Sequence, residues 1–90
     1  LNEERFAKTF AGGKFRMKKW GRIKIRAELK ARGLSAYCVQ KGMAEINPED
    51  YWETLLELAE KKNASEKEPN TLIRKQKVAR FLMSKGYEQD

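Results

Sequence analysis

The fold is decided by two stretches that align without gaps, RIKIRAELKARGL at residues 22–34 and KQKVARFLMSKGY at residues 75–87. Each combines cationic residues with apolar residues at helical spacing, and each ends in a basic residue, a glycine and an apolar residue. The two glycines, Gly33 and Gly86, suit the position just after a helix, where glycine adopts a left-handed backbone at little cost. A unit used twice, about fifty residues apart, is typical of a helical repeat array.

Cap residues predict where the helices begin. A side-chain oxygen just before a helix accepts a hydrogen bond from the first turn, and Pro48 suits the first position of a helix that carries acids in its first turn. The Trp20-Gly21 pair separates the first helix from a second that runs from Arg22 to Arg32. The candidate caps are Asn2, Ser35 and Asn47, and either Asn70 or Thr71 opens the fifth helix.

Two helix ends are marked less sharply. Gly12-Gly13 either ends the first helix or is passed by a helix that continues to about Met17 under tertiary packing. Residues Lys61 to Asn70 are polar and include Pro69, which predicts a loop after the fourth helix. The fifth helix is expected to end at Lys85.

Apolar spacing predicts the core and the fold class. No segment shows the period-2 alternation of a strand, so the fold is expected to be all-α. One three-helix repeat unit is expected at residues 1–46, and a second, truncated before its last helix, at residues 47–90; flanking sequence is therefore expected. The predicted buried residues are Ile25, Leu29, Leu34, Val39, Met43, Trp52, Leu56, Val78 and Leu82.

Composition argues against an enzyme. A chain of 90 residues buries roughly 60–65% of its unfolded surface, too little for a deep catalytic cleft. There is no histidine, and Cys38 is the single cysteine, so no intrachain disulfide forms and a reducing compartment is favoured. No apolar run approaches the roughly 20 residues that span a bilayer. We expect a cytoplasmic protein without catalytic residues, metal site or cofactor.

The strongest functional signal is segregated charge. The net charge is +7, yet residues 45–60 are acidic, and the bases gather in two helical stretches. Clustered bases repel one another, which favours an anion-facing surface over merely solvated helix faces. The candidate partner-binding residues are Lys18, Lys19, Arg22, Lys24, Arg26, Lys30, Arg32, Arg74, Lys75, Lys77, Arg80 and Lys85.

Aromatic and acidic residues near these stretches allow two interpretations. Trp20 and Phe15 either stack on nucleic-acid bases or, as helix junctions favour, pack between the first two helices. Glu49, Asp50 and Glu53 resemble a metal cluster, but their place in the first turns of a helix explains them without an ion. Packing is the favoured interpretation for Trp20 and Phe15, and a favourable position in the helix dipole is the favoured interpretation for the three acids.

Three motifs, taken together, resemble the bacterial regulatory protein RecX family. They are E-R-F-A at residues 4–7 followed by Phe10, G-x-x-x-I-R-x-x-L-x-x-R-G-L at residues 21–34, and K-V-x-x-F-L-x-x-K-G-Y at residues 77–87. The resemblance spans nearly the whole chain and places it over the middle repeat and two helices of the last. The Gly12-Gly13 pair departs from the family pattern, in which the helix continues.

The resemblance implies a curved array of tandem three-helix repeats. It also implies a non-enzymatic regulator that binds the RecA recombinase filament, inhibits its ATPase and strand-exchange activities, and so modulates DNA repair, recombination and the SOS response. The implied partners are RecA and DNA within the filament, with no membrane contact and a monomeric chain. The residues leave one alternative open, a sequence-nonspecific DNA-binding helical module that uses the basic helices.

Overall fold

The protein is all-helical, as predicted. The computed structural model describes residues 2–88, which form five α-helices, one π-helical turn and no strand. Leu1, Gln89 and Asp90, at the ends of the two predicted units, lie outside the described residues. The elements are α1 (Glu3–Gly13), the π-helical turn η1 (Lys14–Lys18), α2 (Arg22–Ala31), α3 (Ala36–Met43), α4 (Pro48–Ser65) and α5 (Thr71–Ser84).

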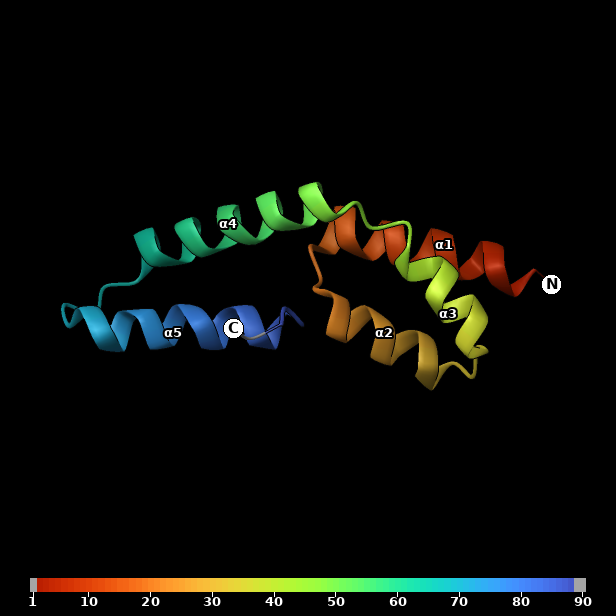
Figure 1. The fold of residues 1–90 in the computed structure, drawn as a ribbon. Helices are drawn as coiled ribbons and strands as arrows, with labels where there is room; N and C mark the ends of the chain where they lie inside the picture. The colour runs from red at the N-terminus through yellow and green to blue at the C-terminus, as the bar shows by residue number, and fades with distance from the viewer. Residues whose placement is uncertain (1, 89–90) are drawn as a thin grey trace.

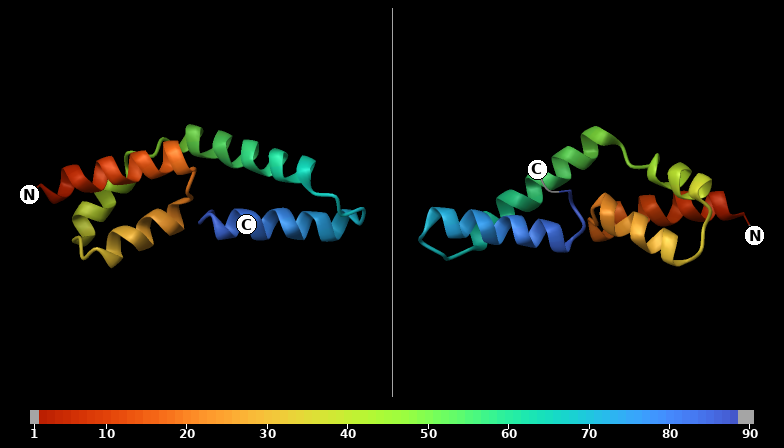
Figure 2. Two further views of the ribbon diagram at one scale, coloured as in Figure 1. Left: turned by 180° about the vertical axis from the view of Figure 1, so that it is seen from behind. Right: turned by 60° about the horizontal axis from the view of Figure 1, so that its bottom comes forward.

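The helices build an elongated molecule of 51 × 21 × 19 Å. Figure 1 shows α1 and α4 following one another along one long edge, while α2 and α5 do so along the other. Helix α3 packs on α1 and α2, and α4 and α5 form a separate hairpin (Figure 2). The division into repeat units at residues 46 and 47 stays a prediction.

The helix starts were predicted correctly. Each confirmed cap side chain accepts a hydrogen bond from a backbone amide two or three residues later, at 2.8 to 3.2 Å. These bonds satisfy donors that the first turn of a helix leaves without an intrahelical partner. The confirmed caps are Asn2, Ser35, Asn47 and Asn70.

Helix α1 passes through Gly12 and Gly13 without a break, which confirms the second of the two predicted alternatives. It widens into η1 and ends at Lys19, whose φ of 57° is left-handed. The wide turn carries Phe15, which is buried in the core. Tertiary packing of this aromatic ring therefore outweighs the low helix propensity of the two glycines.

The core lies mainly where α1, α2 and α3 meet. Ala7 and Ala11 are fully buried, and Gly42 brings α3 so close that a Cβ there would lie 2.7 Å from the carbonyl oxygen of Ala7. Burial is confirmed for Ile25, Leu29 and Val39. The predicted core residues that remain half-buried are Leu34, Met43, Val78 and Leu82.

The predicted inward face of α4 is wrong. Trp52 is 59% exposed and Leu56 42% exposed, whereas Tyr51 is buried. The Tyr51 ring packs between Phe15, with ring centroids 5.8 Å apart, and Tyr87, at 5.1 Å. One residue along a helix turns a side chain by about 100°, so burial of Tyr51 directs Trp52 outward.

Helix α4 is also longer than predicted, because it continues through Lys61 and ends at Ser65. Lys62 and Glu66 form an ion pair of 3.5 Å one turn apart at its end. The predicted loop after the fourth helix is therefore confined to the residues between Ser65 and Thr71.

A backbone contact joins the end of α5 to the start of α2, and we call this contact the seam. The amide of Gly21 donates to the carbonyl of Lys85 at 2.7 Å, and the amide of Ile23 donates to that of Gly86 at 2.9 Å. Between them, the amide of Arg22 donates to the hydroxyl of Tyr51 at 2.9 Å. The unsatisfied donors of one helix thus meet the unsatisfied acceptors of another.

Both signature glycines have the predicted positive φ, 82° at Gly33 and 98° at Gly86. Their surroundings differ, because Gly33 faces open space while a Cβ on Gly86 would overlap Lys24. A Cβ on Gly21 would overlap the backbone carbonyl of Gly86. The seam therefore requires glycine on both sides.

Replacing Gly21 with alanine is expected to open the seam. The backbone of Gly21 (φ −78°, ψ 169°) suits any residue, so the loss comes from the overlap with Gly86 alone. We expect Gly21→Ala to lower the free energy of unfolding by about 1–3 kcal/mol in urea titrations followed by circular dichroism. The matched control Gly13→Ala, at a helical position with open space around it, should gain about 1 kcal/mol. Equal stability of Gly21→Ala and the parent would contradict a tight seam.

Candidate interaction surface

The basic helices lie end to end along one side of the molecule. The seam places α5 directly before α2 in space (Figures 1 and 2), and we call the basic residues that these two helices carry the basic edge: Arg22, Lys24, Arg26, Lys30, Arg74, Lys75, Lys77 and Arg80. The acidic helix α4 lies along the opposite long side. The acids of α4 therefore lie across the molecule from the basic residues of α5, whereas Lys14 and Lys18, in the π-helical turn that continues α1, belong to the same long side as α4.

The predicted partner-binding residues differ in exposure. Lys24 in α2 and Lys85, just after α5, are half-buried beside the seam. Arg22, Arg74 and Lys77 are also half-buried. The exposed members are Lys18, Lys19, Arg26, Lys30, Arg32, Lys75 and Arg80.

Arg22 is engaged within the fold. Its guanidinium lies 4.0 Å from the centroid of the Tyr51 ring, and its Nη1 forms an ion pair of 3.4 Å with Glu88. The Tyr51 hydroxyl also donates to Glu88, while the Tyr87 hydroxyl donates to the carbonyl of Lys19 at 2.9 Å. This network surrounds the seam, so the charge of Arg22 has a structural role.

The same network shifts three pKa values. Burial, reinforced by the neighbouring Glu88 carboxylate, raises the pKa of Tyr51 well above its usual value. Burial likewise raises the pKa of Tyr87 to about 12. Burial opposes ionisation of Glu88, but the hydrogen bond from Tyr51 and the charge of Arg22 outweigh it and hold its pKa below the usual value. Both phenols are therefore neutral and Glu88 is charged at neutral pH.

A second ion-pair cluster engages Lys77 of α5. Its Nζ lies 3.5 Å from Glu66 and 3.7 Å from Glu68, in the loop that joins the hairpin. Burial opposes ionisation of Glu66, but the charges of Lys77 and Lys62 lower its pKa. Lys77 therefore braces the α4–α5 loop, while its neighbours Lys75 and Arg80 point to solvent.

A group of aromatic side chains lies beside the basic edge, and we call Phe6, Phe10 and Trp20 the aromatic row. The ring centroids of Phe6 and Phe10 are 5.7 Å apart, and those of Phe10 and Trp20 are 6.5 Å apart. Phe6 is 37% exposed, while Phe10 and Trp20 are half-buried against the core. Phe15 is fully part of the core, and Trp20 packs against the core with part of its ring still exposed, so the packing interpretation is confirmed for both residues.

Three cations contact these rings. Lys14 Nζ lies 4.8 Å from the Trp20 centroid, and Lys24 Nζ lies 4.5 Å from it on α2. The guanidinium of Arg32 lies 4.8 Å from the Phe10 centroid. The i, i+4 spacing of Phe6 and Phe10 predicted that these two rings share a helix face. The contact of Lys14 with Trp20 was not predicted, because it depends on the π-helical turn η1.

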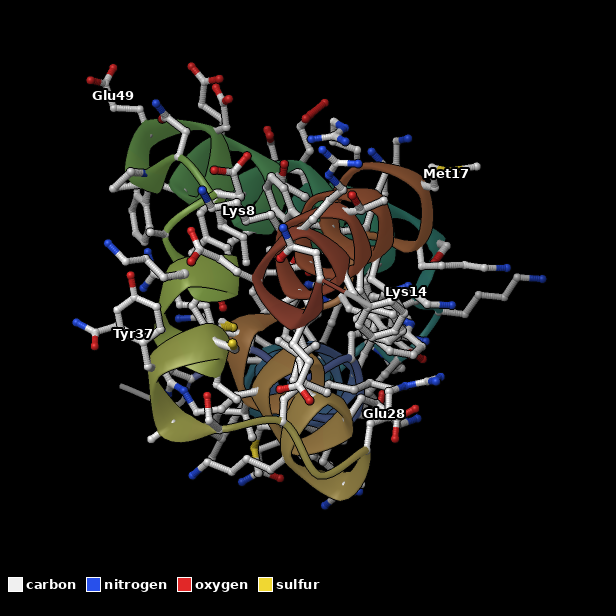
Figure 3. The ribbon with its side chains drawn as sticks, turned by 90° about the vertical axis from the view of Figure 1, so that its right-hand side faces the viewer. Lys8, Lys14, Met17, Glu28, Tyr37 and Glu49 are labelled. Carbon is white, nitrogen blue, oxygen red and sulfur yellow. The ribbon has the colours of Figure 1, made fainter. Side chains whose placement is uncertain are left out.

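One acid interrupts this basic surface. Glu28 lies one turn from both Lys24 and Arg32 on α2, and among residues 2–88 it forms no ion pair within 4 Å. Figure 3 shows Glu28 and Lys14 on the side of the molecule away from Tyr37 of α3. Helix α2 therefore carries an excess of positive charge, with Glu28 as its one carboxylate.

An apolar groove of about 530 Å³ lies between α4 and α5. The exposed side chains of Trp52 and Met83 line this groove together with Leu55 and Leu82. Arg22 and Glu88 also border it. No residue of α5 itself is fully buried. Helix α3 packs over α1 and α2, whereas no described helix packs over the equivalent apolar surface between α4 and α5.

Two further features, a metal site and a membrane-spanning helix, are not found in the described part of the chain. Among residues 2–88, no group of three or more potential ligand side chains is placed to hold a metal ion. None of the described helices combines the length and hydropathy needed to cross a membrane.

Comparison with known proteins identifies relatives of both halves. A family model described as the second three-helix domain of RecX matches residues 2–43, and one described as the third matches residues 49–90. The regulatory protein RecX of Clostridium perfringens (strain 13 / Type A) is 37% identical over 92 residues, covering 100% of this chain and 42% of that protein. The regulatory protein RecX of Salmonella typhi is 37% identical over 90 residues, covering 100% and 52%. The chain thus spans about half the length of these relatives, and no solved structure matches it.

The Glu88 network predicts a pH-dependent stability. Because the folded-state pKa of Glu88 is lowered, its contribution is complete above the unfolded pKa of about 4.3 and is lost as pH falls through the folded pKa. We expect Glu88→Gln to lower the free energy of unfolding by only about 1 kcal/mol at pH 7, since the side chain is 42% exposed.

The difference between Glu88→Gln and the parent should shrink below about pH 4 and vanish near pH 2 in denaturant titrations. Glu53→Gln is the control, because Glu53 is exposed on α4 and forms no ion pair among the described residues. A deficit for Glu88→Gln that persists unchanged at pH 2 would rule out the ionised carboxylate as its source.

Proposed function

Because the chain belongs to the RecX family of regulatory proteins, we propose that it binds the RecA recombinase filament and restrains its ATPase and strand-exchange activities. The observation that carries this proposal is the basic edge, where the seam aligns α5 with α2 in one line. A filament assembled on DNA is an extended partner that carries the negative charge of the DNA. A line of lysine and arginine side chains suits an extended anionic partner better than a compact anionic partner.

The exposed cations of this edge are the proposed contact residues. Arg26, Lys30, Lys75 and Arg80 have no ion pair among residues 2–88, whereas Arg22 and Lys77 are engaged within the fold. Unengaged cations approach a phosphate or carboxylate without first breaking an internal contact. Complementary charge speeds encounter and sets orientation, so the basic edge is proposed to place the chain along the filament.

We propose the two-unit organisation as well. Helices α4 and α5 correspond to α1 and α2 through the aligned signatures at Gly86 and Gly33. The apolar groove beside Trp52 and Met83 lies where the second unit would need a counterpart of α3. A third helix packed there would bury the surface that Trp52 and Leu56 now expose.

The proposed mode of action is stoichiometric binding in the cytoplasm by a monomer, without catalysis, in the context of DNA repair, recombination and the SOS response. The alternative is a sequence-nonspecific DNA-binding module, favoured by the same basic edge. The two differ in their effect on RecA: a plain phosphate binder holds bare DNA with an affinity that falls steeply with salt and leaves the RecA ATPase unchanged, whereas a filament regulator slows that ATPase.

The test is ATP hydrolysis by RecA on single-stranded DNA. We expect the chain to slow hydrolysis to an extent that follows its ratio to filament and does not grow with incubation time. Rising salt should weaken the effect because it screens the basic edge. A longer relative with more modules to engage should bind more tightly than this chain.

Charge-reversal variants locate the contact. We expect Arg26→Glu with Lys30→Glu to weaken filament binding about tenfold or more while leaving the melting temperature nearly unchanged, because exposed charges contribute little to stability. Lys61→Glu, at an exposed position of α4 along the opposite long side, should bind normally. An unchanged ATPase at low salt, together with tight binding to bare DNA, would favour the DNA-binding alternative.

A further inference from the structure

The aromatic row has a feature that packing does not explain. Its rings remain partly exposed, and Lys14, Lys24 and Arg32 contact them while forming no ion pair among residues 2–88. Elsewhere in the described structure, Lys8, Lys62 and Lys77 pair with carboxylates. The charges at the aromatic row are therefore balanced only by the weak attraction of ring faces.

We propose that the aromatic row and its three cations form a binding site for single-stranded nucleic acid. Bases stack on the exposed ring surfaces of Trp20 and Phe6, and the phosphates draw the cations from the rings. The inference deepens the proposed function by naming the partner of this surface as the strand on which the filament forms.

The geometry favours a single strand over other anions. Successive ring centroids lie 5.7 and 6.5 Å apart, so the rings contact one another and form one aromatic surface beside α2. Combined cationic and aromatic surfaces are typical of proteins that bind single strands without sequence preference. A duplex keeps its base faces stacked inside the helix, and an acidic peptide offers no flat rings, so neither uses the aromatic row fully.

The exchange of partners requires no change in the backbone. Lysine ammonium groups at ring faces are held by contacts that are weak at exposed sites, while a phosphate offers a full negative charge. When Lys14 and Lys24 turn toward phosphates, the surface of Trp20 becomes available to a base. The same side chains thus protect the rings in the free protein and bind the backbone in the complex.

Glu28 makes the proposal specific to this face. Its carboxylate lies between Lys24 and Arg32 on α2, where a bound phosphate would meet it. Removing that charge should strengthen binding at this face and nowhere else. An acid of the opposite edge, such as Glu57 on α4, supplies the matched control.

Fluorescence provides the direct test. The chain has two tryptophans, so Trp52→Phe leaves Trp20 as the single reporter. This variant is titrated, without RecA, with oligothymidylate, with an abasic phosphodiester strand of equal length, and with duplex DNA. We expect thymidylate to quench Trp20 and to bind at least tenfold more tightly than the abasic strand, and duplex to leave the emission nearly unchanged.

Substitutions test the residues in the otherwise unmodified chain. We expect Trp20→Leu to weaken thymidylate binding about fivefold to a hundredfold, and Trp52→Leu to have no effect. Glu28→Gln should tighten binding several-fold, whereas Glu57→Gln should not. If Trp20→Leu fails to fold by circular dichroism, Lys14→Gln with Lys24→Gln takes its place and should weaken binding to a similar degree.

The outcomes separate this inference from the proposed function. Equal affinity for thymidylate and abasic strands without quenching would overturn base stacking, and an unchanged affinity in Glu28→Gln would overturn the location. Quenching by thymidylate with an unaffected RecA ATPase would uphold this site and refute the filament proposal. Inhibition of the RecA ATPase without quenching by thymidylate would uphold the filament proposal and refute this site.

Discussion

The arrangement of this molecule depends on the head-to-tail contact of α5 with α2. At the seam, three consecutive amides at the start of α2 find acceptors in two carbonyls and one phenol of the other half. Gly21 has no side chain that could cap the helix, so the cap comes from a segment more than sixty residues away in sequence. Beside this contact, the Phe15–Tyr51 ring pair, the Arg22–Glu88 ion pair and the hydrogen bond from Tyr87 to Lys19 also join the two halves, which the polypeptide connects through the short segment between α3 and α4.

The seam also determines what the charged residues can do. By aligning α5 with α2 it joins two basic helices into one edge, and by recruiting Arg22, Tyr51 and Glu88 it removes one cation from that edge. Burial within this network keeps both phenols neutral, so Arg22 and Glu88 form a complementary pair of charges at the seam, with Lys24 and Lys85 beside it. Structure and proposed recognition therefore draw on the same short segment of α2.

The sequence predicted those features that depend on interactions between residues close together in the chain. The caps at Asn47 and Asn70 and the positive φ at Gly33 follow from interactions within a few residues. The inward face of α4 was mispredicted, since Tyr51 and Trp52 both suit an apolar stripe and only the distant rings of Phe15 and Tyr87 select one of them. The candidate cations were predicted as a group, but whether each faces a carboxylate, a ring or solvent depends on tertiary contacts that helical spacing does not encode.

The two long sides of the molecule are joined in different ways. Along one side the polypeptide itself connects α3 to α4, whereas along the other α5 and α2 are held by hydrogen bonds and glycine contact. Such a rod resists bending that presses α5 against α2, because backbone already touches backbone there. Bending in the opposite sense stretches the hydrogen bonds at the seam. We therefore expect the chain to straighten along its basic edge more easily than it curls further around a partner. Straightening stretches hydrogen bonds, whereas curling presses backbone against backbone.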